Sequence, residues 1–256
     1  MQAILYVGHG SRVKKGNEQL QYFVDQVKKR MPHTIQETCF LELAEPDIIK
    51  GADTCVQQGA NSLVVSPVLL LAAGHIKKDI PDELARVQQK YPELPIHYGD
   101  PFGLHEKVLD VLEQRLASQG WDASQKADIL LVGRGSSDED ALADFDKMRE
   151  ALRRKTGAEH VQKAFLAAAA PSFDEGLERM TTSRAEVVYV LPYLLFTGIL
   201  MKEMEDAIKK KNNHSSAPIK LCDFLGYDEQ LCEVLKQKTQ EAANAPLLFP
   251  GAEPNV

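Results

Sequence analysis

The sequence predicts an α/β protein of two tandem flavodoxin-like domains, each a four-stranded parallel sheet with flanking helices, which face each other across a cleft. Two observations predict this fold. Short β-branched runs alternate with longer amphipathic segments, which is typical of βαβ units and a parallel sheet. The chain also repeats itself: AILYVGHGS at 3–11 aligns with DILLVGRGS at 128–136, an offset of 125 residues.

The first repeat contains four apolar, β-branched runs that predict strands, at 3–8, 35–41, 62–68 and 95–99. Amphipathic stretches between and after them predict helices at 16–31, from Pro46, at 75–90 and at 104–116. The first helix shows the pattern well, because Leu20, Phe23, Val24 and Val27 recur at helical spacing. The order strand, helix, strand therefore holds throughout the first repeat.

The second repeat follows the same order. Strands are predicted at 128–133, 160–166, 186–191 and 218–223, and helices at 138–155, 171–182, 200–211 and 227–242. The polar stretch 118–126 reads as a linker, so the predicted domains are 1–117, which carries the active site, and 127–243, a degenerate repeat that lines the cleft. The tail from Asn244 contains prolines and a glycine and is expected to be irregular.

Composition excludes several classes of protein. The net charge of −7 argues against nucleic-acid binding, which needs a basic face. No apolar run approaches the roughly 20 residues of a membrane span, and no signal peptide is recognisable, so we expect a cytoplasmic protein without a membrane partner. The four cysteines form no C-x-x-C pair and are expected to be buried free thiols: Cys39, Cys55, Cys222 and Cys232.

Three side chains that could bind a metal occur in the first repeat and not in the second. His9, Glu42 and His75 align with Arg134, Ala167 and, after a one-residue gap, Ile199. Each of the three follows the end of a predicted strand. Because ligands of open parallel sheets bind beyond the carboxyl ends of the strands, we expect all three at one edge of one sheet.

Two imidazoles and one carboxylate suit a divalent first-row metal ion. Only two or three protein ligands would leave open coordination positions, as in catalytic metal sites. The same groups can also accept protons. The first repeat therefore predicts a site formed by His9, Glu42 and His75 that holds a metal loosely and takes up the protons that the metal displaces.

The turns around His9 and its aligned residue suggest contacts to an anion. Gly8-His9-Gly10-Ser11 resembles an anion-binding nest, but it lacks the lysine and the spacing of nucleotide-binding loops. Arg134 could clamp a substrate carboxylate with two hydrogen bonds. Other polar candidates for substrate contact are Ser11, Ser136, Arg12, Lys14, Lys15, Lys77 and Lys202, and Val68–Ala73 and Tyr193–Thr197 are expected to line the cleft with apolar atoms.

The strand followed by GHGS, FLELAEPDI at 40–48 and PVLLLAAGHIKKDI at 67–80 together resemble the sirohydrochlorin chelatases of the CbiX/SirB type. The resemblance covers nearly the whole chain, including its duplication. It implies the two-lobed fold of class II chelatases and a lyase that inserts a divalent metal into sirohydrochlorin, giving sirohaem with iron or a cobalamin precursor with cobalt. The family's two metal-site histidines fall on His9 and His75, and its acid falls on Glu42.

Iron is the metal that the resemblance favours. Some cobalt-linked relatives carry a histidine-rich stretch and a C-terminal cysteine motif, and this sequence contains neither. The implied partners are sirohydrochlorin and Fe²⁺, with Co²⁺ as the alternative and no cofactor beyond the substrate metal. A monomer is expected, because two fused lobes can supply what a dimer of single lobes would.

Two other functions fit the same residues. A tetrapyrrole or metal carrier would bind these ligands without catalysis. A hydrolase would use Ser11 with a nearby histidine, or a phosphohistidine at His9, although the sequence lacks a G-x-S-x-G elbow and an arginine directly before His9.

Overall fold

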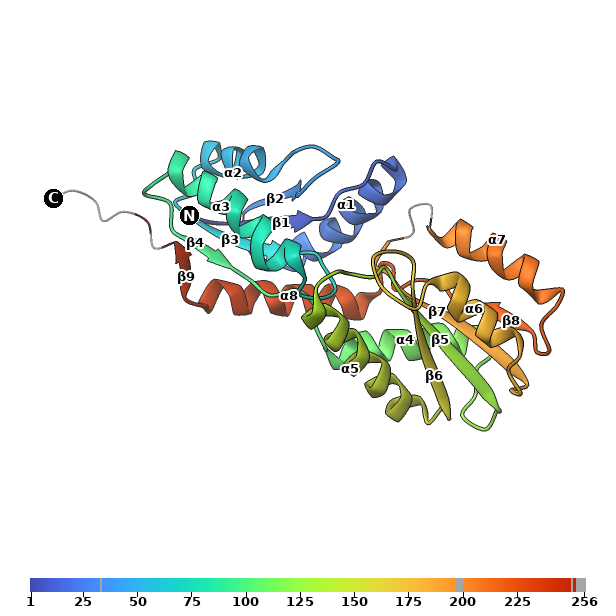
Figure 1. Ribbon diagram of the computed structural model, residues 1–256. Helices are drawn as coiled ribbons and strands as arrows, with labels where there is room; N and C mark the ends of the chain where they lie inside the picture. The colour runs from blue at the N-terminus through green and yellow to red at the C-terminus, as the bar shows by residue number, and fades with distance from the viewer. Residues whose placement is uncertain (33, 197–199, 250, 252–256) are drawn as a thin grey trace. The chain divides into compact units, whose positions relative to one another are not determined.

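The computed structural model describes residues 1–32, 34–196, 200–249 and 251 of the chain (Figure 1). It is an α/β protein that divides into two compact units. Unit 1 comprises Met1–Gly103 and Glu229–Val256, and unit 2 comprises Leu104–Asp228. None of the helices in the described part of the chain is both long and apolar enough to cross a membrane.

Unit 1 is built on one five-stranded sheet. Its strands are β1 (Gln2–Gly8), β2 (Ile35–Phe40), β3 (Ser62–Pro67), β4 (Ile96–Tyr98) and β9 (Leu247–Phe249), in the order β2-β1-β3-β4-β9. The first four strands are parallel, as predicted. The chain runs from β1 to β2 on one side and then crosses to β3 on the other, so the strand order reverses between β1 and β3.

The fifth strand contradicts the expectation that the tail is irregular. β9 pairs antiparallel with β4, and the Nδ1 atom of His97 lies 2.9 Å from the carbonyl oxygen of Ala245. Phe249 also packs against the core of the unit. These apolar and hydrogen-bonding contacts order a short segment whose prolines suggested a loop.

Helices cover both faces of this sheet (Figure 1). On one face α2 (Ile48–Gln57), the π-helical turn η1 (His75–Asp79) and α3 (Ile80–Lys90) enclose a core with alternate residues of β1, namely Ala3, Leu5 and Val7. On the other face α1 (Lys14–Lys28) packs on α8 (Glu229–Asn244), and α8 packs on β3 and β4. A strand buried on both sides reads as a continuous apolar run, which explains the composition of β1.

Unit 2 repeats this plan with four parallel strands. They are β5 (Ala127–Gly133), β6 (His160–Phe165), β7 (Val187–Tyr193) and β8 (Ile219–Leu221), in the order β6-β5-β7-β8. The helices of the unit are α4 (Glu106–Ser118), α5 (Glu139–Thr156), α6 (Phe173–Thr181) and α7 (Leu200–Asn212). The two sheets thus share the order of their first four strands, as expected for a duplicated domain.

The final helix of each repeat belongs to the other unit, which differs from the predicted domains 1–117 and 127–243. Arg115 of α4 donates to the carbonyl oxygens of Phe224 and Leu225 at 2.9 and 2.7 Å and pairs with Asp228 at 3.1 Å, all within unit 2. In unit 1 the hydroxyl of Thr239 in α8 lies 2.7 Å from that of Ser66 in β3. The prediction assigned α4 and α8 to the strands that directly precede them in the sequence. In the structure the side-chain contacts of α4 lie in unit 2 and those of α8 lie in unit 1.

The loops after the first two strands of each repeat have the same backbone. Gly10 and Gly135 have φ of +90° and +95°, and Leu43 and Ala168 have φ of 61° and 54°. The peptide bonds before Pro46 and Pro171 are both cis. Each pair is separated by the offset of 125 residues, so the duplication preserves the loop geometry even where the side chains have diverged.

Candidate functional site

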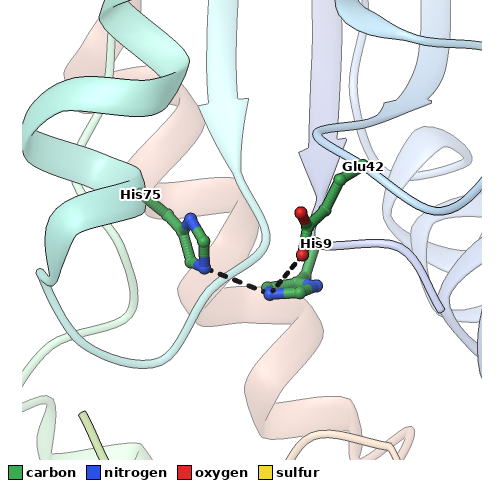
Figure 2. A group of neighbouring side chains, drawn as sticks. All are labelled: His9, Glu42 and His75. Atoms are coloured by element: carbon green, nitrogen blue, oxygen red, sulfur yellow. Dashed lines mark hydrogen bonds and ion pairs between the residues drawn. The ribbon is translucent and has the colours of Figure 1, made fainter. Parts of the chain in front are cut away.

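The candidate site lies at the carboxyl edge of the sheet in unit 1. His9 follows β1, Glu42 follows β2, and His75 opens η1 after β3. Since the strand order reverses between β1 and β3, the two histidines flank the point at which ligands bind in open α/β sheets. The prediction that the three side chains converge at one sheet edge is confirmed (Figure 2).

Backbone hydrogen bonds tie the loop of His9 to the loop of Glu42. The amide of Glu42 donates to the carbonyl oxygen of His9 at 3.0 Å, and the amide of Leu41 donates to that of Gly8 at 2.8 Å. A Cβ atom at Gly10 would collide with the carbonyl group of Glu42, and the φ of +90° is itself unfavourable for other residues. Glycine at position 10 therefore allows the two loops to approach each other.

The segment that carries His75 is fixed in a different way. The amides of Phe102 and Gly103 donate to the carbonyl oxygens of Leu69 and Leu70 at 2.9 and 2.8 Å, which anchors the loop between β3 and η1. Gly74, directly before His75, has an ordinary helical φ of −46°, and no atom of the described residues lies within 4 Å of the position that a Cβ would occupy, so the backbone does not require glycine there.

The side chains of His9, Glu42 and His75 point toward one another (Figure 2). The Nε2 atoms of His9 and His75 are 3.1 Å apart, and Nε2 of His9 is 3.5 Å from Oε1 of Glu42. The ring planes of the two histidines meet at 85°. One donor atom from each of the three residues lies within 4.8 Å of the others, which is close enough for all three to reach one ion.

The outer nitrogen of each imidazole determines which atom faces the site. Nδ1 of His9 lies 2.9 Å from the carbonyl oxygen of Gly10, and Nδ1 of His75 lies 2.8 Å from a carboxylate oxygen of Asp79. Both partners are acceptors, so each Nδ1 carries a hydrogen. In the neutral tautomers both Nε2 atoms then present lone pairs on the same side at a separation of 3.1 Å, so both can be directed at one ion.

The distance between these atoms fits a metal ion. Two imidazole nitrogens that bind one ion at about 2.1 Å, with an angle of about 90–110° at the ion, lie about 3.0–3.4 Å apart. The observed 3.1 Å falls within that interval. Histidine ligands that are oriented by a carbonyl or a carboxylate on the outer nitrogen are also the usual arrangement at metal sites.

The site is open to solvent on the ligand side. The side chains of His9, Glu42 and His75 retain 23%, 49% and 38% of their exposure. Three protein donors leave coordination positions free, which distinguishes a site for exchange or catalysis from a closed structural site. The chemistry available is therefore metal binding together with proton acceptance by imidazole and carboxylate.

The predicted substrate-binding residues occupy equivalent loops in the two units. The hydroxyl oxygen of Ser11 accepts the amide of Val13 at 3.0 Å, and that of Ser136 accepts the amide of Asp138 at the same distance. Arg12 and Arg134 are exposed. The structure places Ser11 and Arg12 in the loop after His9, and Arg134 and Ser136 in the matching loop of unit 2; their role in substrate binding stays a prediction.

Part of the predicted apolar lining is wrong. Tyr193, Leu194 and Leu195 are only 3%, 6% and 8% exposed and lie in the core of unit 2, and Val68 is likewise buried in unit 1. The stretch 69–73 is half-buried and stays a candidate for contact with an apolar ligand. Thr197 and Ile199, which were compared with the first repeat or assigned to the lining, lie outside the described residues.

Comparison with known proteins identifies the family of the chain. The model of the CbiX family matches residues 3–119 and again residues 128–242. The chain belongs to the CbiX family. The double match also supports the duplication that was read from the sequence.

Individual CbiX relatives are similar over nearly the whole chain. A sirohydrochlorin ferrochelatase of Priestia megaterium is 41% identical over 240 residues, which are 94% of this chain and 90% of the relative. A sirohydrochlorin cobaltochelatase of the same organism is 39% identical, over 94% of this chain and 80% of the relative. A structure of SirB from Bacillus subtilis with Fe³⁺ has a TM-score of 0.88 and 37% identity, covering 98% of this chain and 99% of that one.

Sequence reasoning missed one residue of this site in the CbiX chain. Asp79 binds the outer nitrogen of His75, and the prediction named no such partner. The signal was present in the sequence, because a carboxylate four residues after a histidine lies on the same face of a predicted helix. It was not decisive, since such acids also commonly cap or solvate a helix.

Proposed function

We propose that this protein catalyses the insertion of a divalent metal ion, Fe²⁺, into sirohydrochlorin to form sirohaem. The observation that carries the proposal is the pair of Nε2 atoms of His9 and His75 at 3.1 Å, with the carboxylate of Glu42 3.5 Å from the first. This arrangement supplies an open metal site and a proton acceptor within one group of side chains. The ferrochelatase and cobaltochelatase relatives support the same reaction class.

The chemistry of the substrate accounts for these residues. Metallation of sirohydrochlorin replaces two pyrrole protons by the metal, so a catalyst must deliver an ion and accept protons. Nε2 of His9 and Nε2 of His75 would hold the incoming ion through their lone pairs. The half-exposed carboxylate of Glu42 lies beside His9 and can accept a proton from the macrocycle.

The carboxylates of the macrocycle need cationic and hydrogen-bonding partners. Sirohydrochlorin carries eight carboxylates, whereas the protein has a net charge of −7, so local groups must provide the attraction. Arg12 and Arg134 are the arginines we assign to this task, with the hydroxyls of Ser11 and Ser136 as further contacts. Both arginines are exposed and so accessible to a ligand, and the two serines are half-buried.

Iron is our assignment for the metal, with cobalt as the alternative. Affinity for nitrogen and oxygen ligands does not itself separate Fe²⁺ from Co²⁺. The ferrochelatase relative matches over 90% of its own length and the cobaltochelatase relative over 80%, while the identities of 41% and 39% are nearly equal. We propose that the protein acts as a monomer in the cytoplasm and needs no cofactor beyond the substrate metal.

The direct test is anaerobic metallation. Purified protein is mixed with sirohydrochlorin and Fe²⁺, and the absorption spectrum of the macrocycle is followed against a protein-free control, with parallel reactions in Co²⁺ and Ni²⁺. A rate above the control that is fastest with Fe²⁺ is expected. No acceleration with any of the three metals would reject the chelatase, and a faster reaction with Co²⁺ would reject the choice of iron.

The carrier alternative makes a different prediction in the same experiment. A carrier would bind the macrocycle or the ion in a stoichiometric complex and would not turn over. Multiple turnovers per protein molecule would therefore exclude it. Turnover of a generic phosphate or carboxylic ester that is lost in His9→Ala would instead indicate the hydrolase.

A further inference from the structure

Asp79 makes a direct contact with one of the two site histidines. Its Oδ2 atom lies 2.8 Å from Nδ1 of His75, and both side chains are partly exposed, by 48% and 38%. Asp79 lies where η1 continues into α3, with helical φ and ψ of −66° and −44°, and its side chain makes no hydrogen bond to the first amides of α3. The carboxylate is therefore directed at His75 and not at the helix end.

This contact determines which nitrogen of His75 faces the site. A carboxylate on Nδ1 requires a hydrogen there, so Nε2 keeps its lone pair and points to Nε2 of His9. It also holds the ring in one orientation. At the corresponding position Nδ1 of His9 lies 2.9 Å from the carbonyl oxygen of Gly10, which is a neutral acceptor.

The backbone that carries His75 and Asp79 forms a widened, π-helical turn. The amide of Ile80 donates to the carbonyl oxygen of His75, a hydrogen bond over five residues that defines the π-helical turn. The next residue, Pro81, has no amide hydrogen and cannot donate to the carbonyl oxygen of Ile76 in the same pattern or to Lys77 in an α-helical one. The widened turn thus coincides with the proline that follows it.

The carbonyl oxygen of Ile76, which Pro81 cannot serve as a donor, accepts a hydrogen bond from a side chain. The hydroxyl of Tyr98, at the end of β4, donates to the carbonyl oxygen of Ile76 at 3.0 Å. Tyr98 itself packs against the core of unit 1. A hydroxyl from the sheet therefore fastens the turn that carries His75 and Asp79, and the turn is not held by its own helix alone.

We infer that Asp79 is the positioning residue of His75, and that Tyr98 clamps the π-helical turn in which the two residues meet. The inference rests on the proposed metal-binding role of the His9–His75 pair. Asp79 orients the ring and fixes its tautomer, and Tyr98 fixes the backbone. Neither residue is needed to touch the macrocycle.

The test measures binding of Co²⁺ alone by isothermal titration and by the visible absorption of the bound ion. Asp79→Ala removes the hydrogen-bond acceptor of His75. Asp79→Asn keeps the shape of the side chain but replaces the charged acceptor by a weaker, neutral one. Loss of a partner of this kind lowers metal affinity about 10- to 100-fold, so we expect that loss in Asp79→Ala and a smaller loss in Asp79→Asn. The absorption bands of bound Co²⁺ should shift in both variants, which a change in general stability would not produce.

A matched control is available three residues away. Asp82 is also acidic and exposed, and its hydrogen bond and ion pair are with Lys78, at 2.5 Å. Asp82→Asn removes the same charge from the same segment, so it should bind Co²⁺ within about twofold of the wild type. Tyr98→Phe deletes only the hydroxyl and should weaken Co²⁺ binding by a smaller factor than Asp79→Ala.

Several outcomes would overturn the inference. Asp79→Ala and Asp79→Asn that keep the affinity and the spectrum of the wild type would do so, as would an equal loss in Asp82→Asn. If Asp79→Ala does not fold, the nearly isosteric Asp79→Asn decides. Because the measurement uses the metal alone, a wild type that binds Co²⁺ but does not metallate sirohydrochlorin would reject the proposed function and leave the role of Asp79 intact.

Discussion

His9 and His75 place their Nε2 atoms 3.1 Å apart although they are 66 residues apart in the sequence. Each of the two rings has its outer nitrogen bound by an acceptor from its own loop. The lone pairs of both Nε2 atoms can therefore be directed at one cation. This relationship connects the fold of unit 1 to metal chemistry and sets the predictions that follow.

Removal of either imidazole should abolish tight metal binding. His9→Ala and His75→Ala each remove one of two nitrogen ligands, so we expect Co²⁺ affinity and the rate of sirohydrochlorin metallation to fall by at least about 100-fold, since removing a ligand costs more than the 10- to 100-fold of an outer partner. Isothermal titration and anaerobic absorption kinetics give the two values. His214→Ala is the control, because His214 is exposed. Full metallation by both site variants would refute the site.

Glu42→Gln should separate metal binding from proton transfer. The amide keeps the shape of the side chain but cannot accept a proton, and general acid–base catalysis contributes about 10²- to 10⁴-fold. We expect metallation to slow by about 100-fold, while Co²⁺ affinity changes much less because both imidazoles remain. Steady-state kinetics and titration on the same preparation provide the comparison. Equal losses in rate and affinity would make Glu42 a ligand only.

Gly10→Ala should disturb the site through the backbone. The added Cβ would collide with the carbonyl group of Glu42, and the φ of +90° is strained for alanine. We expect the free energy of unfolding to fall by more than about 1 kcal/mol and metallation to slow, because the loops of His9 and Glu42 must separate. Gly74→Ala is the matched control: its φ is −46° and its Cβ position is empty, so stability should be unchanged or slightly higher. Urea unfolding of both variants tests the difference.

Arg134→Ala should weaken binding of the macrocycle without affecting the metal. The arginine is assigned to a substrate carboxylate, so we expect a higher KM for sirohydrochlorin and an unchanged Kd for Co²⁺. Loss of a charge-assisted hydrogen bond of about 1.5–3 kcal/mol corresponds to roughly a 10- to 100-fold rise in KM. Arg154→Ala serves as the control, since Arg154 is exposed and only loosely paired with Glu150 at 3.8 Å. An unchanged KM would remove Arg134 from the substrate site.

The cysteines should be unreactive in the folded protein. All four are buried, as the sequence predicted, and burial raises the pKa of Cys55 and of Cys222 to about 12 and that of Cys39 well above its ordinary value. At pH 8 the thiolate is then a minor form that is also inaccessible, so a chromogenic disulfide reagent should react slowly with native protein and at four equivalents after denaturation. Rapid labelling of the native protein would contradict this burial.

The alternation of strand and helix in the sequence was sufficient to predict two parallel sheets and their order of elements. Hydrophobic periodicity is a local property, so the runs at 3–8 and 62–68 indicated β1 and β3 directly. It was insufficient for α4 and α8, because each helix has an apolar face that fits more than one sheet. Contacts such as Arg115 to Asp228 and Ser66 to Thr239 choose between the possibilities, and they join residues more than 100 positions apart.

The site, like the fold, was predictable from the sequence only in part. The repeat, and its loss of histidine and carboxylate in the second copy, singled out by sequence alone the residues that we propose carry the chemistry, and their convergence was predictable because the carboxyl ends of parallel strands meet at one sheet edge. Only the tertiary structure decided which nitrogen of each ring faces the other. That choice depends on acceptors brought by the turn of Gly10 and by the π-helical turn of Asp79, and the second turn is also held by the hydroxyl of Tyr98, which comes from a different strand and is not part of the local sequence.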